Sequence, residues 1–177
     1  DKLDEIYAQL FGTEAALVRI QFVNGTHAIA CALFGALKAG DVLFVSSVSG
    51  RTKSVVDLAW DCMQKGITVI ALTSMVYASK VDPVHESGKK LHEFVTLALD
   101  NCAPAAEAML EVEGLEAHFA ASSGIASDYI MWSLTSVCVE KMLRDGFTPG
   151  ILKSANFPGG NDYNKTVIEP HYDEFGW

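Results

Sequence analysis

The chain has 177 residues, half of them hydrophobic and a fifth charged, which is enough to form one compact domain with a sizeable core. Its formal net charge of -9 argues against nucleic acid or an anionic membrane as a partner, because an acidic surface repels both. No apolar run approaches the roughly 20 residues of a membrane span, and the N-terminus lacks the basic and then apolar order of a secretion signal. We therefore expect a cytoplasmic protein without a membrane partner.

Four widely spaced cysteines, two of them within helical apolar faces, predict small buried thiols. A disulfide framework or a zinc site would need closer or more regular spacing. We therefore expect no bound metal and no cofactor. The four are Cys31, Cys62, Cys102 and Cys138.

The first 37 residues predict two helices with a strand between them. The pattern of residues 1–11 is that of a short amphipathic helix, residues 16–23 read as a strand, and residues 28–37 as a strongly apolar helix. The turn between that strand and the second helix has the sequence Asn24-Gly25-Thr26-His27. These residues form a strand-turn-helix unit.

A second strand-turn-helix unit follows directly. Residues 42–45 form an apolar run typical of a buried strand, and a helical pattern begins near Thr52. Between them lie several hydroxyl side chains and Gly50, which tolerates a positive φ. The first N–H groups of a helix lack internal partners and lie at the positive end of the helix dipole, so a phosphate can bind there. The alternative is that Ser49 or Thr52 only caps the helix.

Further elements complete a predicted α/β domain over residues 1–177. Residues 67–72 form the clearest buried strand, and Thr73, Ser74 and Tyr77 lie at its carboxyl end, where parallel sheets bind ligands. Then come a surface loop over 79–90, a short helix near Leu91, a strand over 94–99 and short strands over 109–112 and 117–120. The order predicts a three-layer αβα sandwich with a mostly parallel, Rossmann-like or flavodoxin-like sheet of about five strands.

A long helix is predicted from about Ser123 to Arg144, ended by Gly146. Apolar residues occupy nearly every side of it, which predicts a homodimer; a lost packing partner would expose the same surface. The tail, 147–177, contains Pro149, Pro158-Gly159-Gly160 and Pro170 and is expected to be extended and turn structure.

The loop Ser47-Val48-Ser49-Gly50-Arg51-Thr52 resembles the phosphate-binding loop of sugar isomerase (SIS) domains, which read S-x-S-G-x-T after a strand. The resemblance extends over about residues 40–177, including HESGKKL and SANFPGGNDYN. It implies that Ser47, Ser49, Gly50 and Thr52 hold the phosphate of a phosphosugar, and it agrees with a homodimer. Residue 48 departs from the pattern, because it is often polar in that family and is valine here.

Residues 1–43 resemble instead the pyridoxal-phosphate enzymes of the methionine gamma-lyase and aluminium-resistance type. That resemblance implies a phosphate contact at Gly25, Thr26 and His27; the alternative for His27 is a helix-cap or core contact. The Schiff-base lysine of the family falls beyond the matched region, so lysine-dependent chemistry is expected to be absent. The changeover at Gly40-Asp41-Val42-Leu43 suggests an engineered chimera of fragments 1–43 and 44–177, with a divergent natural protein as the alternative.

Three residues are candidates for acid/base chemistry. Glu111 and Glu113 flank Val112 in an apolar region, where burial would suit a carboxylate to proton transfer; a solvated or capping role is the alternative. His85 lies in the stretch that resembles the SIS-family loop. We expect a domain that binds phosphate or a phosphosugar without intact catalysis. The alternatives are an active, homodimeric aldose-ketose isomerase and a residual binder of pyridoxal phosphate.

Overall fold

The computed structural model describes residues 37–175. The elements predicted before residue 37, and with them Gly25, Thr26 and His27, lie outside the described residues. The chain forms two compact units, which divide between Ser127 and Asp128.

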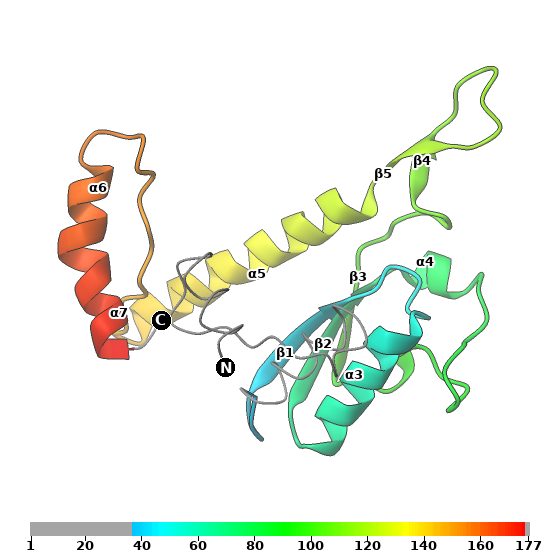
Figure 1. The fold of residues 1–177 in the computed structure, drawn as a ribbon, viewed down its shortest axis with the longest axis horizontal. Coiled ribbons are helices and arrows are strands. Elements are labelled where there is room, and N and C mark those ends of the chain that lie inside the picture. Colours follow the sequence, from blue (N-terminus) through cyan, green and yellow to red (C-terminus); the bar gives the residue numbers. More distant parts are fainter. Residues whose placement is uncertain (1–36, 176–177) are drawn as a thin grey trace, which may run out of the picture. The chain divides into compact units, whose positions relative to one another are not determined.

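The first unit contains a three-stranded parallel sheet in the order β1-β2-β3 (Figure 1). β1 is Val42–Ser46, β2 is Thr68–Thr73 and β3 is Leu97–Asp100. In the register of the three strands Val45 lies opposite Ala71, which lies opposite Ala98. Because the strands are parallel, their carboxyl ends meet at one edge of the sheet, and that edge carries the candidate site.

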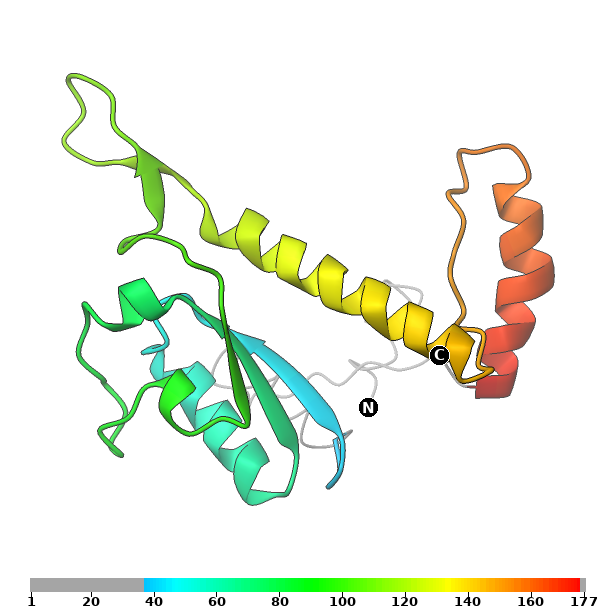
Figure 2. The ribbon, with the colours of Figure 1, turned by 180° about the vertical axis from the view of Figure 1, so that it is seen from behind.

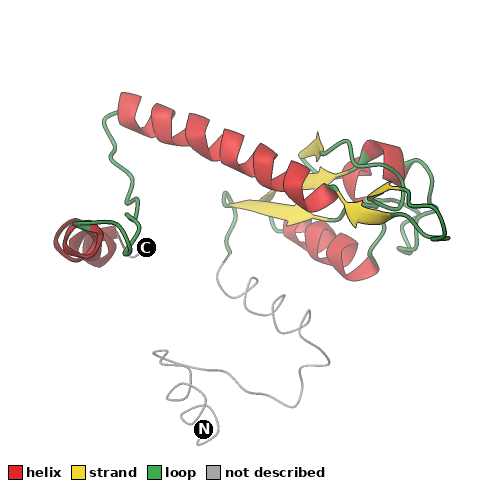
Figure 3. Cartoon of the chain, turned by 90° about the horizontal axis from the view of Figure 1, so that it is seen from above, coloured by secondary structure: helices red, strands yellow, loops and turns green. Residues whose placement is uncertain are grey.

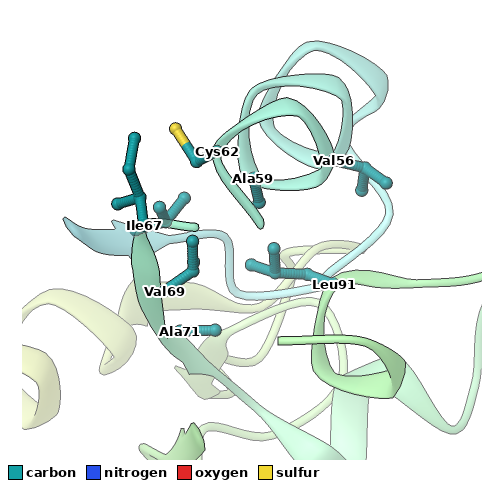
Figure 4. Close-up of a cluster of buried hydrophobic side chains, with 8 residues drawn as sticks. Val56, Ala59, Cys62, Ile67, Val69, Ala71 and Leu91 are labelled. Carbon is teal, nitrogen blue, oxygen red and sulfur yellow. The ribbon is translucent and has the colours of Figure 1, made fainter. Parts of the chain in front are cut away.

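Helix α3, Lys53–Gln64, covers one face of this sheet (Figure 1). Its buried residues recur at the three-residue spacing of one helical face, at Val56, Ala59 and Cys62. Figure 4 shows Ala59 of this face directed at the sheet residue Val69. The core cluster consists of Val45, Val56, Ala59, Cys62, Ile67, Val69, Ala71 and Leu91. The positions of β1, α3 and β2 were thus predicted correctly by their hydrophobic patterns, but the burial expected for β1 is found only at Val45.

The opposite face of the sheet carries exposed apolar side chains. Val42 and Phe44 alternate with the core residue Val45 and are 52% and 42% exposed. The residues that the structure describes therefore establish a mixed α/β fold with helices and a parallel three-stranded sheet. The sheet of about five strands and the third layer stay predictions.

The connection from β2 to β3 contains two short helical segments. They are α4, Met75–Ala78, and the 3-10 helix η1, Leu91–Glu93. The strand β3 begins three residues later than predicted, because Phe94 and Val95 pack against the core cluster as part of the connection. The ring of Phe94 lies 5.1 Å from that of Trp60 on α3.

The two short strands that were predicted around Gly114 form an antiparallel hairpin (Figure 2). β4 is Ala108–Leu110 and β5 is Phe119–Ala121, with Ala108 opposite Ala121 and Leu110 opposite Phe119. The hairpin is a separate two-stranded sheet and does not extend the parallel one.

The predicted long helix is present as α5, Ser123–Arg144, and runs without interruption (Figure 3). Gly146 follows it with a φ of 86°, a conformation that suits glycine after a helix. Between residues 37 and 175 no helix combines the length and the apolar character that crossing a bilayer requires.

The extended tail predicted for residues 147–177 is wrong in its second half. Three consecutive helical segments occupy it: α6, Gly160–Tyr163, the π-helix η2, Asn164–Ile168, and α7, Glu169–Phe175. Gly159 precedes them with a φ of 77°, so the glycines start a helix here. Pro170 lies in the first turn of α7, directly after the wider π turn, where its missing N–H and its ring are tolerated.

Candidate anion-binding site

The serine loop, residues 47–52, follows β1 and is held by backbone hydrogen bonds to the carboxyl end of β2 and to Ser74 directly after it. The N–H of Ser47 donates to Leu72 O at 3.0 Å, and the N–H of Ser74 donates to Val48 O at 2.8 Å. The hydroxyl of Thr73 donates to the same Val48 carbonyl at 3.1 Å. These bonds fix the loop at the carboxyl edge of the sheet, so its side chains begin from a rigid backbone.

Gly50 turns the loop back toward η1. It has a φ of 64°, and its carbonyl accepts a hydrogen bond of 2.8 Å from Leu91 N–H. A Cβ at this position would lie 3.1 Å from Thr73 Oγ1, closer than ordinary van der Waals contact. Glycine is therefore required here by both conformation and space. The role that the structure gives Gly50 is packing of the loop; its contact with a phosphate stays a prediction.

Hydroxyl groups lie at the start of α3. Ser47 is 8% exposed, and its Oγ donates to Thr52 Oγ1 at 3.4 Å. Thr52 is the N-cap residue, yet its side chain makes no capping hydrogen bond. Ser49 Oγ accepts a 3.5 Å hydrogen bond from Arg51 N–H. The capping role that was the alternative for Thr52 is therefore absent.

The first turn of α3 is open to an anion. Among residues 37–175, none accepts a hydrogen bond from the backbone N–H of Lys53 or Ser54, and no acidic side chain lies in that turn. The guanidinium of Arg51, one residue before the N-cap, also has no partner within this range. The helix dipole and these donors together form an electropositive position beside the serine hydroxyls.

His85 contacts α3 at Asp57 and Trp60, C-terminal to the first residues of the helix. Its side chain is 10% exposed, its Nε2 is 3.0 Å from Asp57 Oδ1, and its ring centroid is 5.9 Å from that of Trp60. Its Nδ1 accepts the N–H of Ser87 at 3.2 Å, which places the proton of the neutral ring on Nε2. These contacts fasten the 79–90 loop to α3; no described residue links His85 to the serine loop.

The ammonium group of Lys53 pairs with the two carboxylates near His85, those of Asp57 and Glu86. Its Nζ lies 3.2 Å from Asp57 Oδ1 and 2.9 Å from Glu86 Oε1. The hydrogen bond to Lys53 lowers the pKa of Glu86, and the hydrogen bond to Glu86 raises the pKa of Lys53. Asp57, His85 and Glu86 could hold a metal ion, since one ligand atom of each lies within 4.8 Å of the others. A cation there would have to displace Lys53 and the proton on His85 Nε2.

Glu111 and Glu113 lie on the β4–β5 hairpin and are both exposed. The carboxylate of Glu111 is 3.0 Å from His118 Nε2 in an exposed ion pair. Burial, on which their acid/base assignment relied, is therefore not found. No contact within the described residues joins either side chain to the serine loop or to His85.

The structure also brings His92 and Asn101, which the sequence did not indicate, to this edge beside Ser74, which the sequence placed there. Leu91 and His92 pack against Gly50, and His92 Nδ1 is buried without a hydrogen-bond partner among the described residues. Ser74 Oγ donates to Ala103 O at 2.6 Å, and Asn101 Nδ2 donates to Ser127 Oγ at 3.1 Å. His92 has no local sequence pattern, because it reaches the loop through a long connection. Asn101 could have been found from its position after a strand, as Ser74 was.

Comparison with known proteins gives matches to two descriptions. The methionine gamma-lyase family model matches residues 1–66. A UPF0309 protein of Shouchella clausii is 38% identical over 135 residues, which are 76% of this chain and 55% of that protein. UPF0309 proteins of Oceanobacillus iheyensis and Streptomyces griseus are 33% and 34% identical, over 78% and 76% of this chain and 56% and 54% of their own lengths.

These matches correct the family assignment made from the sequence. The relatives are UPF0309 proteins, so the assignment to sugar isomerase domains is wrong. The methionine gamma-lyase match continues to residue 66, through the changeover at Gly40–Leu43 and past the serine loop, so the engineered junction is wrong as well. The chain spans about half the length of the curated relatives it matches, and it is similar to UPF0309 proteins over three quarters of its own length.

Proposed function

We propose that the serine loop and the first turn of α3 bind the phosphate group of a small phosphorylated metabolite, with a phosphosugar as the expected class. The observation that carries the proposal is a helix start whose first N–H groups are not satisfied by any described residue. Thr52 does not cap the helix, the first turn contains no acid, and the N–H groups of Lys53 and Ser54 have no acceptor among residues 37–175.

Phosphate suits this position because it offers several acceptor oxygens at once. The hydroxyls of Ser47, Ser49 and Thr52 and the guanidinium of Arg51 are further donors around the helix start. The net charge of -9 supplies no general attraction for an anion, so affinity has to come from these local donors. A phosphosugar or pyridoxal phosphate would share this chemistry at its phosphate end.

We propose that the site binds its phosphorylated ligand without catalysing an isomerase reaction. An isomerase requires a positioned base near the sugar, and the two predicted carboxylates, Glu111 and Glu113, are exposed on a hairpin. His85 is engaged by Asp57 and Ser87 on the other side of Lys53. We also propose that the exposed Val42 and Phe44 belong to a sheet face covered by the third layer of an αβα sandwich, as parallel sheets normally are.

The test is thermal unfolding with added ligands. Inorganic phosphate, fructose 6-phosphate and pyridoxal phosphate are each titrated against wild type and against Ser49→Ala with Thr52→Ala. A ligand at 100 times its Kd stabilises the folded state by about 2.7 kcal/mol, which raises the Tm of a chain this size by several degrees. We expect this shift in wild type and a clearly smaller one in the double variant.

The control is Thr148→Ala, an exposed threonine without a hydrogen-bond partner in the described part of the chain. It should retain the full ligand shift. Equal shifts in wild type and the double variant would contradict the site. A shift with pyridoxal phosphate alone, without phosphate or fructose 6-phosphate, would replace the phosphosugar with a cofactor phosphate.

A further inference from the structure

Three side chains beside α3 are joined in the order hydroxyl, imidazole and carboxylate. Ser87 Oγ lies 2.7 Å from His85 Nδ1, and His85 Nε2 lies 3.0 Å from Asp57 Oδ1. Because Nδ1 also accepts the N–H of Ser87, it has no proton of its own, so the Ser87 hydroxyl donates to it. This is the arrangement in which a base can remove the proton of a nucleophile while a carboxylate holds the base.

The imidazole ring is fixed in one orientation. The side chain of His85 is 10% exposed, and its ring centroid lies 5.9 Å from that of Trp60. Asp57 is held by its helix and by Lys53, whose Nζ lies 3.2 Å from Oδ1. A turn alone accounts for the bonds within residues 85–89. It does not account for the carboxylate on α3 that holds the other ring nitrogen.

The Ser87 hydroxyl, in contrast, is accessible. Ser87 is exposed, and Gly88 follows it with a φ of 69° and donates its N–H to His85 O at 2.9 Å, which closes a tight turn. The N–H of Lys89 donates to Ser87 Oγ at 3.2 Å. The N–H of Ser87 loses its acceptor once Nδ1 takes up a proton. Two backbone donors beside Oγ can therefore stabilise negative charge that develops there.

We propose that Ser87 is a nucleophile for the hydrolysis of small carboxylic esters, with His85 as its general base and Asp57 as a positioning residue. Ser87 Oγ forms a bond to the carbonyl carbon while its proton passes to His85 Nδ1. The bond from this carbon to the alcohol oxygen then breaks, and the alcohol leaves with that proton. Asp57 accepts the Nε2–H throughout and stabilises the ring while it is charged.

Water completes the cycle as the second reactant. It attacks the acyl carbon and gives a proton to Nδ1, the bond from the acyl carbon to Ser87 Oγ breaks, and the proton returns to Oγ. The products are a carboxylic acid and an alcohol. Small, unhindered esters suit an exposed serine. The activity is separate from phosphate binding, since no described contact joins His85 to the serine loop.

The first experiment measures the release of p-nitrophenol from p-nitrophenyl acetate by the whole chain. Ser87→Ala and His85→Gln should each lower the rate by about 10²-fold or more, the usual contribution of a general base. Ser79→Ala is the matched control, because the Ser79 hydroxyl lies in the same loop and donates to Val76 O at 2.8 Å. It should retain the full rate. Hydrolysis that survives Ser87→Ala would overturn the proposal.

The second measurement separates positioning by Asp57 from a structural role. Asp57→Asn keeps the shape of the side chain but removes its charge, so it should lower kcat by about 10²-fold or more and leave KM unchanged. A structural loss would instead lower the fraction of folded protein seen by circular dichroism. An unchanged kcat in folded Asp57→Asn would overturn the triad.

The third measurement locates the nucleophile. A fluorophosphonate probe, which reacts with activated serines, should label folded wild type, and mass spectrometry should place the adduct on Ser87. The adduct should be absent in concentrated urea and reduced in His85→Gln. Absence of the adduct from folded wild type, or equal labelling of Ser87 in folded and unfolded chains, would contradict activation by His85. Ser87→Ala, a change at an exposed residue, keeps the test valid if His85→Gln does not fold.

Discussion

At the scale of single residues, the serine loop has either a structural or a binding role, and the side chain of Thr52 distinguishes the two by whether it caps α3. A threonine that caps a helix normally stabilises it by accepting a backbone hydrogen bond, and the side chain of Thr52 does not do so. Within residues 37–175, the one hydrogen bond of its Oγ1 is the 3.4 Å contact with Ser47 Oγ. The residue is thus placed at a helix start without performing the usual function of that position.

We predict that Thr52→Ala costs less than about 0.5 kcal/mol of unfolding free energy without ligand, below the usual 0.5–2 for a lost cap. Ser74→Ala is the control, because Ser74 Oγ accepts the N–H of Tyr77 and donates to Ala103 O, and it should cost about 1 kcal/mol or more. Urea unfolding measures both. A large loss in Thr52→Ala would restore the capping explanation.

At the scale of elements, the 79–90 loop and α3 are joined by charges as well as by the ring of His85. Lys53 lowers the pKa of Glu86, so this carboxyl binds its proton less readily folded than unfolded. Its contribution to stability is therefore present above the usual pKa of 4.5 and is lost as pH falls through the lowered value. The pKa of Lys53 is raised above its usual 10.5, so the contribution of this pair to stability is lost again as pH rises through that raised value.

We predict that Glu86→Gln lowers the urea midpoint at pH 7 and that the difference from wild type disappears in acid, as pH falls through the lowered pKa of Glu86. Both partners are well exposed, so 1 M salt should shrink the difference. Glu116→Gln, at an exposed carboxylate without an ionic partner in residues 37–175, should show no such pH dependence. A difference that persists in acid strong enough to protonate all the carboxylates would show that the charge is not its cause.

Elements with a strong periodic pattern could be predicted from the sequence, and those set by distant contacts could not. β1, α3, β2 and α5 have clear apolar runs or helical spacing, and each was confirmed. β3 starts late because Phe94 is held by Trp60, a contact between residues far apart in sequence. The tail was misread because its prolines and glycines suggested turns.

At the scale of the whole molecule, the two compact units suggest that their stabilities are separable. Leu91 is fully buried in the core cluster of the first unit, whereas Ile168 is buried in the second. We predict that Leu91→Ala costs about 3 kcal/mol and speeds hydrogen exchange throughout α3 and β2, while η2 keeps its protection. Leu152→Ala, which is 60% exposed, is the control. Equal loss of protection in both units would show that they unfold together.

The candidate site was only partly predictable from the sequence. The local turn from β1 into α3 contains the hydroxyls, the glycine and the helix start within six residues, so its chemistry can be read directly. His92 reaches the loop through the long connection from β2 to β3, which a local pattern does not encode. The burial expected for Glu111 and Glu113 is absent for a related reason, since an apolar neighbourhood in sequence did not become burial in the fold.

The sequence by itself determined the strands, the principal helices and the glycine-dependent turn at 47–52, because these follow from hydrophobic period and backbone freedom over a few residues. The tertiary structure decided three other matters: that Thr52 leaves its helix uncapped, that His85 is engaged with Asp57, and that Trp132 on α5 is exposed. Each depends on which distant groups meet in space, and the free energy of such contacts is set by geometry and burial that short stretches of sequence do not fix.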